Sequence, residues 1–194
     1  WAGAPAKAAI THAREQVASL LGAKPAEIVF TSGGSEANNH AIKGAVFRAK
    51  RTGVAAPHVI ATTDAHPAVL APLGYLEQFG ARVSLVPVDG TGRISPDAVR
   101  EVISSNTVLV TILHANNETG TLQPIREIAD IAHEAGALMH SDAAQAVGKV
   151  PVHVDELGVD LLSVAGHKLY APKGVGALYV RTGVEIDPLV HGGN

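Results

Sequence analysis

Short apolar segments alternate with segments of helical periodicity along almost the whole chain. The run from Val108 to Leu113 (VLVTIL) is apolar or β-branched throughout, as in a strand that is buried on both faces. Further strands are expected at 27–31, 58–62, 82–87, 138–141, 161–164 and 177–181. Because parallel strands need long connections that are usually helices, this alternation predicts an α/β fold. We expect three layers, a mostly parallel sheet covered by helices on both faces.

Proline marks the expected starts of three helices between these strands. Pro67, Pro96 and Pro124 each precede an apolar pattern of helical spacing. Proline is tolerated at the first helical position because the N–H of that residue has no partner within the helix. We therefore expect three helices that begin at these residues.

Length and composition limit the kinds of protein that the chain can be. Its 194 residues, 46% hydrophobic and 17% charged, suit one folded domain with a full core. The formal charge of -3 provides no basic field for nucleic acid or an anionic membrane, and no apolar run is long enough to cross a bilayer. The chain contains no cysteine, which excludes disulfides, zinc–thiolate sites and a cysteine nucleophile within it. We expect no metal site and a cytoplasmic location.

Ligands of open α/β sheets bind beyond the carboxyl ends of the strands, so the residues after each strand form the candidate site. After the first strand, Gly33, Gly34 and Ser35 precede a helix whose free N–H groups and dipole favour an anion. The alternative is a tight turn at the glycines, with Ser35 as a helix cap. After the second strand comes His66, whose ring can face the site or only cap the next helix.

Polar residues also follow the later strands of the expected sheet. Asn117 belongs to the segment 114–120, which suits either a site for a polar ligand or an asparagine-rich turn. Asp142 closes an apolar strand, where a carboxylate is costly unless it is paired or caps a helix, and Gln145 follows three residues later. Lys168 directly follows a buried strand, where desolvation would favour a neutral, nucleophilic amine, although most lysines are solvated.

Together these residues match the chemical needs of pyridoxal phosphate. An anion cradle suits its phosphate, and the ring of His66 can stack on its pyridine. A carboxylate such as Asp142 keeps the ring nitrogen protonated, so that the ring accepts electrons, and Lys168 can bind the aldehyde as a Schiff base. The combination predicts a pyridoxal-phosphate site.

Five ordered motifs resemble those of the cysteine desulfurases, which belong to the class V aminotransferase branch of the fold type I pyridoxal-phosphate enzymes. The motifs are Phe30–Asn39, His66–Leu70, Asn116–Gly120, His140–Gln145 and Gly166–Gly174. The resemblance runs from about residue 6 to residue 193. It implies that Lys168 binds the cofactor aldehyde, that Asp142 pairs with the ring nitrogen, and that His66 stacks on the ring.

The resemblance also implies residues that hold the rest of the cofactor. Gly34 and Ser35 would bind the phosphate with help from His167. Gln145 would hydrogen-bond the ring hydroxyl, and Asn117 would lie beside the cofactor and meet the substrate.

The chain departs from the family pattern at Ala165, where many relatives have a serine, so one hydrogen-bond donor to the phosphate is missing. The apolar residue at this position, together with the segments Ala115–Gly120 and Asp142–Gln145, also resembles the selenocysteine lyases. The resemblance implies that the family's first segment, and its small carboxyl-terminal domain with the persulfide cysteine, lie outside the 194 residues. We therefore expect residues 1–194 to be the pyridoxal-phosphate-binding large domain, truncated at both ends.

The resemblance implies a cysteine desulfurase, which converts L-cysteine to L-alanine and leaves the sulfur as a protein persulfide for iron–sulfur clusters or thio-cofactors. It also implies a homodimer, with a sulfur-acceptor scaffold protein as partner. The alternative enzyme is a selenocysteine lyase or another class V lyase or transaminase. An alternative of a different class is a truncated module without turnover, and the chain as given is expected to lack full activity.

Overall fold

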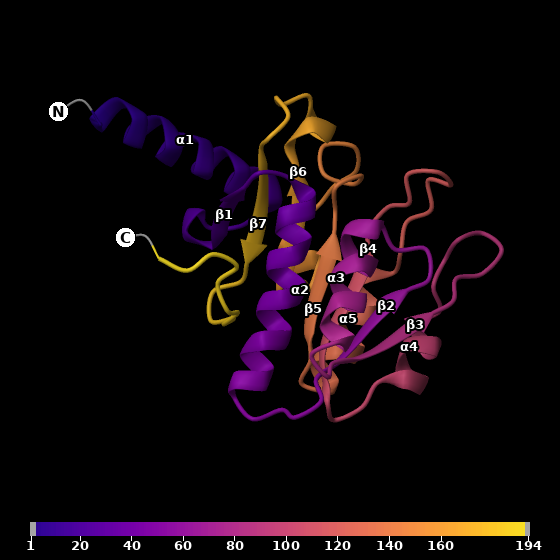
Figure 1. Ribbon diagram of the computed structural model, residues 1–194. Helices are drawn as coiled ribbons and strands as arrows, with labels where there is room; N and C mark the ends of the chain where they lie inside the picture. Colours follow the sequence, from indigo (N-terminus) through magenta and orange to yellow (C-terminus); the bar gives the residue numbers. More distant parts are fainter. Residues whose placement is uncertain (1–2, 193–194) are drawn as a thin grey trace.

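Seven strands form one sheet in the computed structural model, which describes residues 3–192 (Figure 1). The strands are β1 (Ile28–Thr31), β2 (His58–Thr62), β3 (Arg82–Val86), β4 (Thr107–Leu113), β5 (Leu138–Asp142), β6 (Leu161–Ala165) and β7 (Gly176–Val180). Their spatial order is β1-β7-β6-β5-β4-β2-β3, and β7 runs antiparallel to both neighbours while the other pairs are parallel. The mostly parallel sheet is confirmed, and the expected domain range of 1–194 extends two residues beyond the described part at each end.

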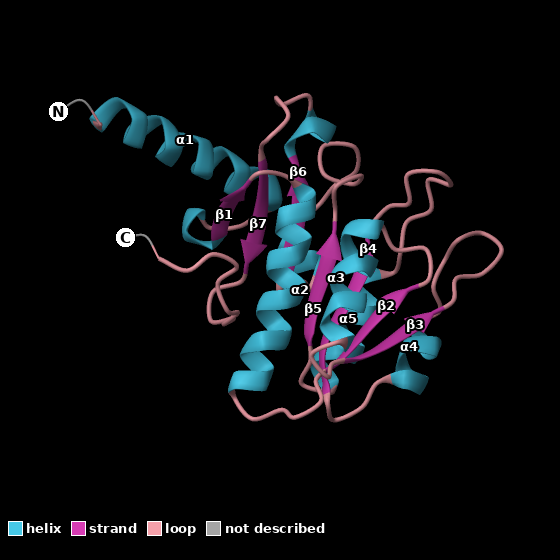
Figure 2. Cartoon of the chain, viewed as in Figure 1, coloured by secondary structure: helices cyan, strands magenta, loops and turns pink. Residues whose placement is uncertain are grey.

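Helices cover both faces of the sheet, which confirms the three layers (Figure 2). One face carries α2 (Gly34–Arg51) and α3 (Pro67–Glu77), and the other carries α1 (Ala4–Leu21), α4 (Pro96–Val102), α5 (Ile125–Glu134) and α6 (Val154–Leu157). Side chains alternate between the two cores along each strand, so Val59 of β2 packs with α2 and α3 whereas Ile60 packs on the opposite face. None of the described helices has the length and apolar character needed to cross a membrane.

The proline prediction is right for two helices and one residue early for the third. Helices α3 and α4 begin at Pro67 and Pro96. Helix α5 begins at Ile125, and Pro124 is its N-cap, with a backbone ψ of 63° that is not yet helical. The four-residue helix α6 was not expected from the sequence, because it is too short to show a helical period.

A buried imidazole joins three strands in the middle of the sheet. His140 of β5 lies between Thr111 Oγ1 of β4, 2.7 Å from its Nδ1, and Ser163 Oγ of β6, 3.0 Å from its Nε2. Burial lowers the pKa of His140 to about 3, so this ring is neutral in the folded protein. His58 lies in the same way between hydroxyl groups of β4 and β3.

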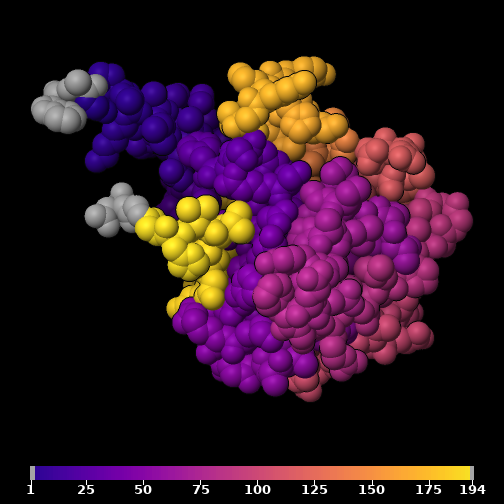
Figure 3. Space-filling view, in the orientation of Figure 1, coloured from indigo at the N-terminus to yellow at the C-terminus, as the bar shows by residue number. Residues whose placement is uncertain are grey.

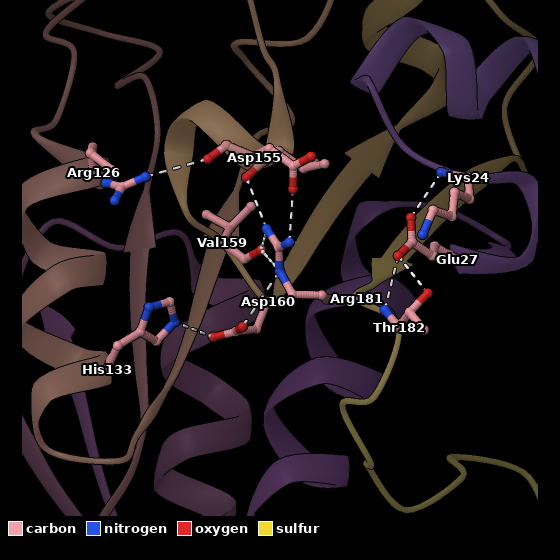
Figure 4. Close-up of polar contacts among 10 residues, drawn as sticks. Lys24, Glu27, Arg126, His133, Asp155, Val159, Asp160, Arg181 and Thr182 are labelled. Carbon is pink, nitrogen blue, oxygen red and sulfur yellow. Dashed lines mark hydrogen bonds and ion pairs between the residues drawn. The ribbon is translucent and has the colours of Figure 1, made fainter.

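Arg181, directly after β7, links several elements at the amino ends of the central strands (Figure 4). Its guanidinium donates to Asp155 Oδ1 at 2.8 Å and to the carbonyl oxygen of Val159 at 2.9 Å. Asp160, which precedes β6, accepts a hydrogen bond from His133 Nε2 at 2.8 Å. These contacts join β7, α6 and α5 at the end of the sheet that lies away from the candidate site.

The segment after β7 packs against α2, and Figure 3 shows the two side by side, the segment in yellow and the helix in purple. The N–H of Asp187 donates to the carbonyl oxygen of Gly44 at 3.0 Å. A Cβ on Gly44 would lie 2.7 Å from the carbonyl oxygen of Asp187, so this close contact requires glycine in the helix. The Arg51–Asp187 ion pair of 2.7 Å also holds the segment against α2.

Candidate active site

A cavity of about 480 Å³ lies at the carboxyl ends of β1, β2, β4, β5 and β6, within the size range of small-molecule sites. Residues after all five strands contribute to its wall. Every site residue predicted from the sequence lines it: Gly34, Ser35, His66, Asn117, Asp142, Gln145, His167 and Lys168. The fold therefore brings together residues that are far apart in the sequence, while their individual roles stay predictions.

The first turn of α2 is the part of the structure where the sequence predicts an anion cradle. The helix begins at Gly34 with Gly33 as N-cap, and no side chain of the described residues caps it. Its first backbone hydrogen bond runs from Ala37 N–H to the carbonyl oxygen of Gly33 at 3.1 Å, so the N–H groups of residues 34–36 have no partner within the helix. Ser35 is not the N-cap, and the alternative that it serves only as a cap is wrong.

Small residues bring the cradle close to β6 and β7. A Cβ on Gly34 would lie 3.2 Å from the Cβ of Ala165, which is 3% exposed. A Cβ on Gly176 would lie 2.6 Å from the Cα of Gly33, so β7 has to begin with glycine where the loop after β1 passes over it. The cradle is thus fixed between the sheet and α2, with a methyl group at position 165 and no hydroxyl.

Asp142 ends β5, lines the cavity and is 3% exposed. Its Oδ1 accepts a hydrogen bond from the N–H of Ala144 at 3.1 Å, which is the local capping contact considered as its alternative role. Its Oδ2 accepts from Nδ2 of Asn38 at 2.7 Å. Asn38 lines the cavity and was missed as a site residue, although a polar residue among the apolar buried positions of α2 was a signal for it.

His66 serves as both a helix cap and a cavity residue. Its Nδ1 accepts a hydrogen bond from the N–H of Ala68 at 3.0 Å as the N-cap of α3, so Nε2 carries the proton when the ring is neutral.

The asparagine-rich segment 114–120 also combines its two expected roles, a turn and part of the site. Asn116 Oδ1 accepts the N–H of Glu118 at 2.8 Å and so makes the turn, which leaves Asn117 to line the cavity.

Lys168 and His167 lie at the rim of the cavity, in a short 3-10 helix that directly follows β6 (η2, Gly166–Leu169). Both are exposed, so the expectation that burial desolvates Lys168 is wrong. Gln145 Oε1 accepts a hydrogen bond from Lys149 Nζ at 2.7 Å, which leaves the Gln145 amide nitrogen as a donor.

Glu36 brings a negative charge to the cavity wall near the cradle. Hydrogen bonds from the Ser32 side chain and then from the Ser32 backbone N–H lower the pKa of the Glu36 carboxyl group. The same bonds draw this carboxylate back toward the loop after β1. The charge of Glu36 is therefore partly satisfied within the protein, and the N–H groups of the first turn stay available to an anion.

The class-V aminotransferase family matches residues 2–194. The cysteine desulfurase IscS of Dictyoglomus turgidum is 50% identical over 192 residues, which cover 99% of this chain and 48% of that protein. The cysteine desulfurase IscS of Methanosarcina thermophila is 49% identical over 191 residues, which cover 98% of this chain and 46% of that protein. A solved structure described as SspA in complex with cysteine has a TM-score of 0.92 and 46% identity, over 97% of this chain and 54% of that chain.

These matches confirm the resemblance predicted from the five motifs. The chain spans about half the length of the curated relatives it matches. Class-V aminotransferases and cysteine desulfurases are dependent on pyridoxal phosphate. With a match over nearly all of its residues and a cavity lined by the expected set, the chain belongs to the class-V aminotransferase family.

Proposed function

We propose that the chain is the cofactor-binding large domain of a longer pyridoxal-phosphate-dependent cysteine desulfurase. The observation that carries this proposal is the convergence of the α2 cradle, His66, Asp142 and Lys168 around one cavity. The enzyme would convert L-cysteine to L-alanine and pass the sulfur atom to a thiol, which becomes a persulfide. The names of the close relatives support this choice of substrate.

The donors and acceptors of the cavity fit the polar groups of the cofactor. The free N–H groups of α2 and the Ser35 hydroxyl suit a phosphate dianion, and His167 adds a donor at the rim. The buried carboxylate of Asp142 suits a protonated ring nitrogen. When bound, pyridoxal phosphate supplies an aldehyde that joins amines and a protonated ring that accepts an electron pair.

The residues around the cavity would bind and orient the cofactor and substrate, and one of them would transfer protons. Lys168 places an amine at the exposed rim, where an incoming amino acid can reach it and where it can carry a proton between substrate atoms. The Nδ1 of His66 is engaged by the N–H of Ala68, which fixes the ring and leaves Nε2 as its free nitrogen. Asn117 and the amide nitrogen of Gln145 would orient polar groups of the cofactor and the substrate.

The sulfur acceptor has to lie outside this chain, because the chain contains no cysteine. We propose that the thiol belongs to another segment of the longer enzyme, which then serves a sulfur-acceptor scaffold protein in iron–sulfur cluster assembly. The cytoplasmic location stays a prediction.

A homodimer is proposed on the distribution of exposed apolar side chains. Tyr170, two residues beyond Lys168, is fully exposed in a left-handed conformation with φ 62°. Leu20 and Val175 are also exposed on this side of the molecule, around a small apolar depression between α1 and the start of β7. A second copy would cover these side chains, and sedimentation of the active full-length enzyme as a monomer would contradict the dimer.

The test is to add L-cysteine to the full-length, cofactor-loaded enzyme with a thiol reductant and to measure alanine and sulfide. We expect both products in equal amounts, and none from Lys168→Ala. Release of alanine from L-selenocysteine but not from L-cysteine would favour the selenocysteine lyase, for which Ala165 is the supporting observation. A loaded enzyme that forms no product from either substrate would favour a module without turnover.

A further inference from the structure

Asn38 contacts the candidate site from the buried side of α2. It is 1% exposed, and the other buried residues of this helix are small or aliphatic. Its Nδ2 donates a hydrogen bond to Oδ2 of Asp142 at 2.7 Å, although the two residues are 104 positions apart. Because a buried amide is costly unless it is hydrogen-bonded, this contact accounts for a polar residue in an apolar helix face.

The Asn38 amide is oriented so that its nitrogen bonds Asp142 while its oxygen is left without a hydrogen bond from the described residues. The Oδ1 atom of Asn38 is buried and has no hydrogen-bond partner in the described chain. Turning the amide over would place Oδ1 against the carboxylate, where both atoms are acceptors. The amide therefore keeps its donor on Asp142 and leaves Oδ1 unpaired, which is unfavourable for a buried acceptor.

The carboxylate of Asp142 is thereby held at both oxygens by two separate elements. Oδ1 is held by the backbone N–H of Ala144 after β5, and Oδ2 is held by Asn38 of α2. We propose that Asn38 is a positioning residue, which aims the Asp142 carboxylate at the ring nitrogen of the cofactor. This inference rests on the proposed function, and Asn38 acts through Asp142 and not by contact with the substrate.

The test uses the full-length enzyme loaded with pyridoxal phosphate that carries ¹⁵N in its ring. The NMR shift of that nitrogen reports its protonation. In Asn38→Leu, an apolar group of similar size replaces the amide, and we expect the shift to move toward the unprotonated form. We expect kcat to fall about 10- to 100-fold with little change in KM, because substrate binding is not affected.

Asn39→Ala is the matched control on the same helix. The Asn39 side chain donates to the carbonyl oxygen of Ser35 at 2.9 Å and does not contact Asp142. The nitrogen shift is expected to stay at the wild-type value in this control. An unchanged shift in loaded Asn38→Leu overturns the inference even if kcat falls, since the effect then does not pass through Asp142.

A second variant covers the case in which Asn38→Leu does not fold. Asn38→Ala has a smaller side chain that lets water approach Asp142, and we expect a smaller displacement of the shift in the same direction. No displacement in Asn38→Ala overturns the inference. A wild-type enzyme that does not bind the cofactor contradicts the proposed function instead, so the two failures are distinguishable.

Combining Asn38→Leu with Asp142→Asn gives an independent test. If Asn38 acts through Asp142, the double variant is expected to have the same kcat as Asp142→Asn alone. Reductions in kcat that multiply would show that Asn38 acts independently and would overturn the inference.

Discussion

The methyl group of Ala165 lies against the backbone of Gly34, with its Cβ 3.2 Å from the position that a Cβ on Gly34 would take. The end of β6 thus meets the first residue of α2 at the anion cradle. The side chain at position 165 contributes no hydrogen-bond donor there, so on the proposed function a bound phosphate would depend on the helix N–H groups, on Ser35 and on His167, which line the cavity.

Ser35→Ala is expected to weaken cofactor binding. A hydrogen bond from a hydroxyl to a charged oxygen contributes about 1.5–3 kcal/mol, which corresponds to a dissociation constant about 10- to 150-fold higher. The measurement is the dissociation constant of pyridoxal phosphate in the full-length protein. Ser95→Ala is the control, since Ser95 is an exposed N-cap of α4 without a side-chain capping bond. Unchanged affinity in Ser35→Ala would place the phosphate elsewhere.

Ala165→Ser is expected to strengthen cofactor binding, because the new hydroxyl lies next to the cradle and can donate to the phosphate. The gain should be smaller than the loss in Ser35→Ala, because in the wild type a water molecule can already supply part of the missing hydrogen bond to the phosphate. The double variant with Ser35→Ala should recover part of the lost affinity. Weaker binding in Ala165→Ser than in the wild type would contradict this account.

Asp142→Asn is expected to leave the fold intact and to remove most of the turnover. The amide is similar in size to the carboxylate but carries no negative charge for a protonated ring nitrogen, and such electrostatic contributions are worth about 100-fold or more in kcat. Circular dichroism checks the fold, and alanine formation from L-cysteine checks the rate. Asp97→Asn, an exposed substitution in α4, serves as the control. An Asp142→Asn enzyme with the wild-type rate would refute the role of this carboxylate.

The stability of the fold is expected to fall in acid because of His140. Burial lowers the pKa of His140 from 6.5 to about 3. Between these two pH values the imidazole is protonated in the unfolded chain and neutral in the folded chain. The free energy of unfolding should therefore decrease as the pH falls from about 6.5 toward 3, by up to about 1.4 kcal/mol per pH unit for one proton. Denaturant unfolding at several pH values measures this slope.

His140→Gln removes the titrating group and should make the slope less steep, whatever its effect on stability at neutral pH. His12→Gln changes an imidazole whose side chain is 71% exposed and should keep the wild-type slope. Equal slopes in the wild type and in His140→Gln would show that the imidazole is not held neutral by folding.

The order of strands and helices could be predicted from the sequence because it depends on local patterns. The apolar run before Leu113 and the prolines at residues 67 and 96 fall where the structure has a buried strand and two helix starts. The antiparallel direction of β7 does not follow from an alternation that favours parallel strands, although the ten residues 166–175 between β6 and β7 are too few for a parallel crossover. Pro124 was placed one residue too far into the helix, because capping and first helical positions differ only in backbone angles.

The site residues that directly follow strands could be predicted, because the topology of the sheet alone brings the ends of its parallel strands together. Asn38 lies within a helix and meets Asp142 across 104 positions, so no local spacing reveals the pair. The exposure of Lys168 was also misjudged, because a buried strand does not determine the burial of the residues that follow it. Side-chain pairing and exposure depend on the packed structure, whereas strand ends follow from the fold class.

Borohydride reduction of the cofactor-loaded protein, followed by peptide mapping, identifies the lysine that binds the cofactor aldehyde. Reduction makes the bond between the cofactor aldehyde and the protein amine permanent, so the labelled residue identifies the attachment point. Lys168 lines the cavity, whereas Lys173, in the same motif, does not. We expect the label on Lys168 and its loss in Lys168→Ala, and a label on Lys173 would contradict the assignment of Lys168.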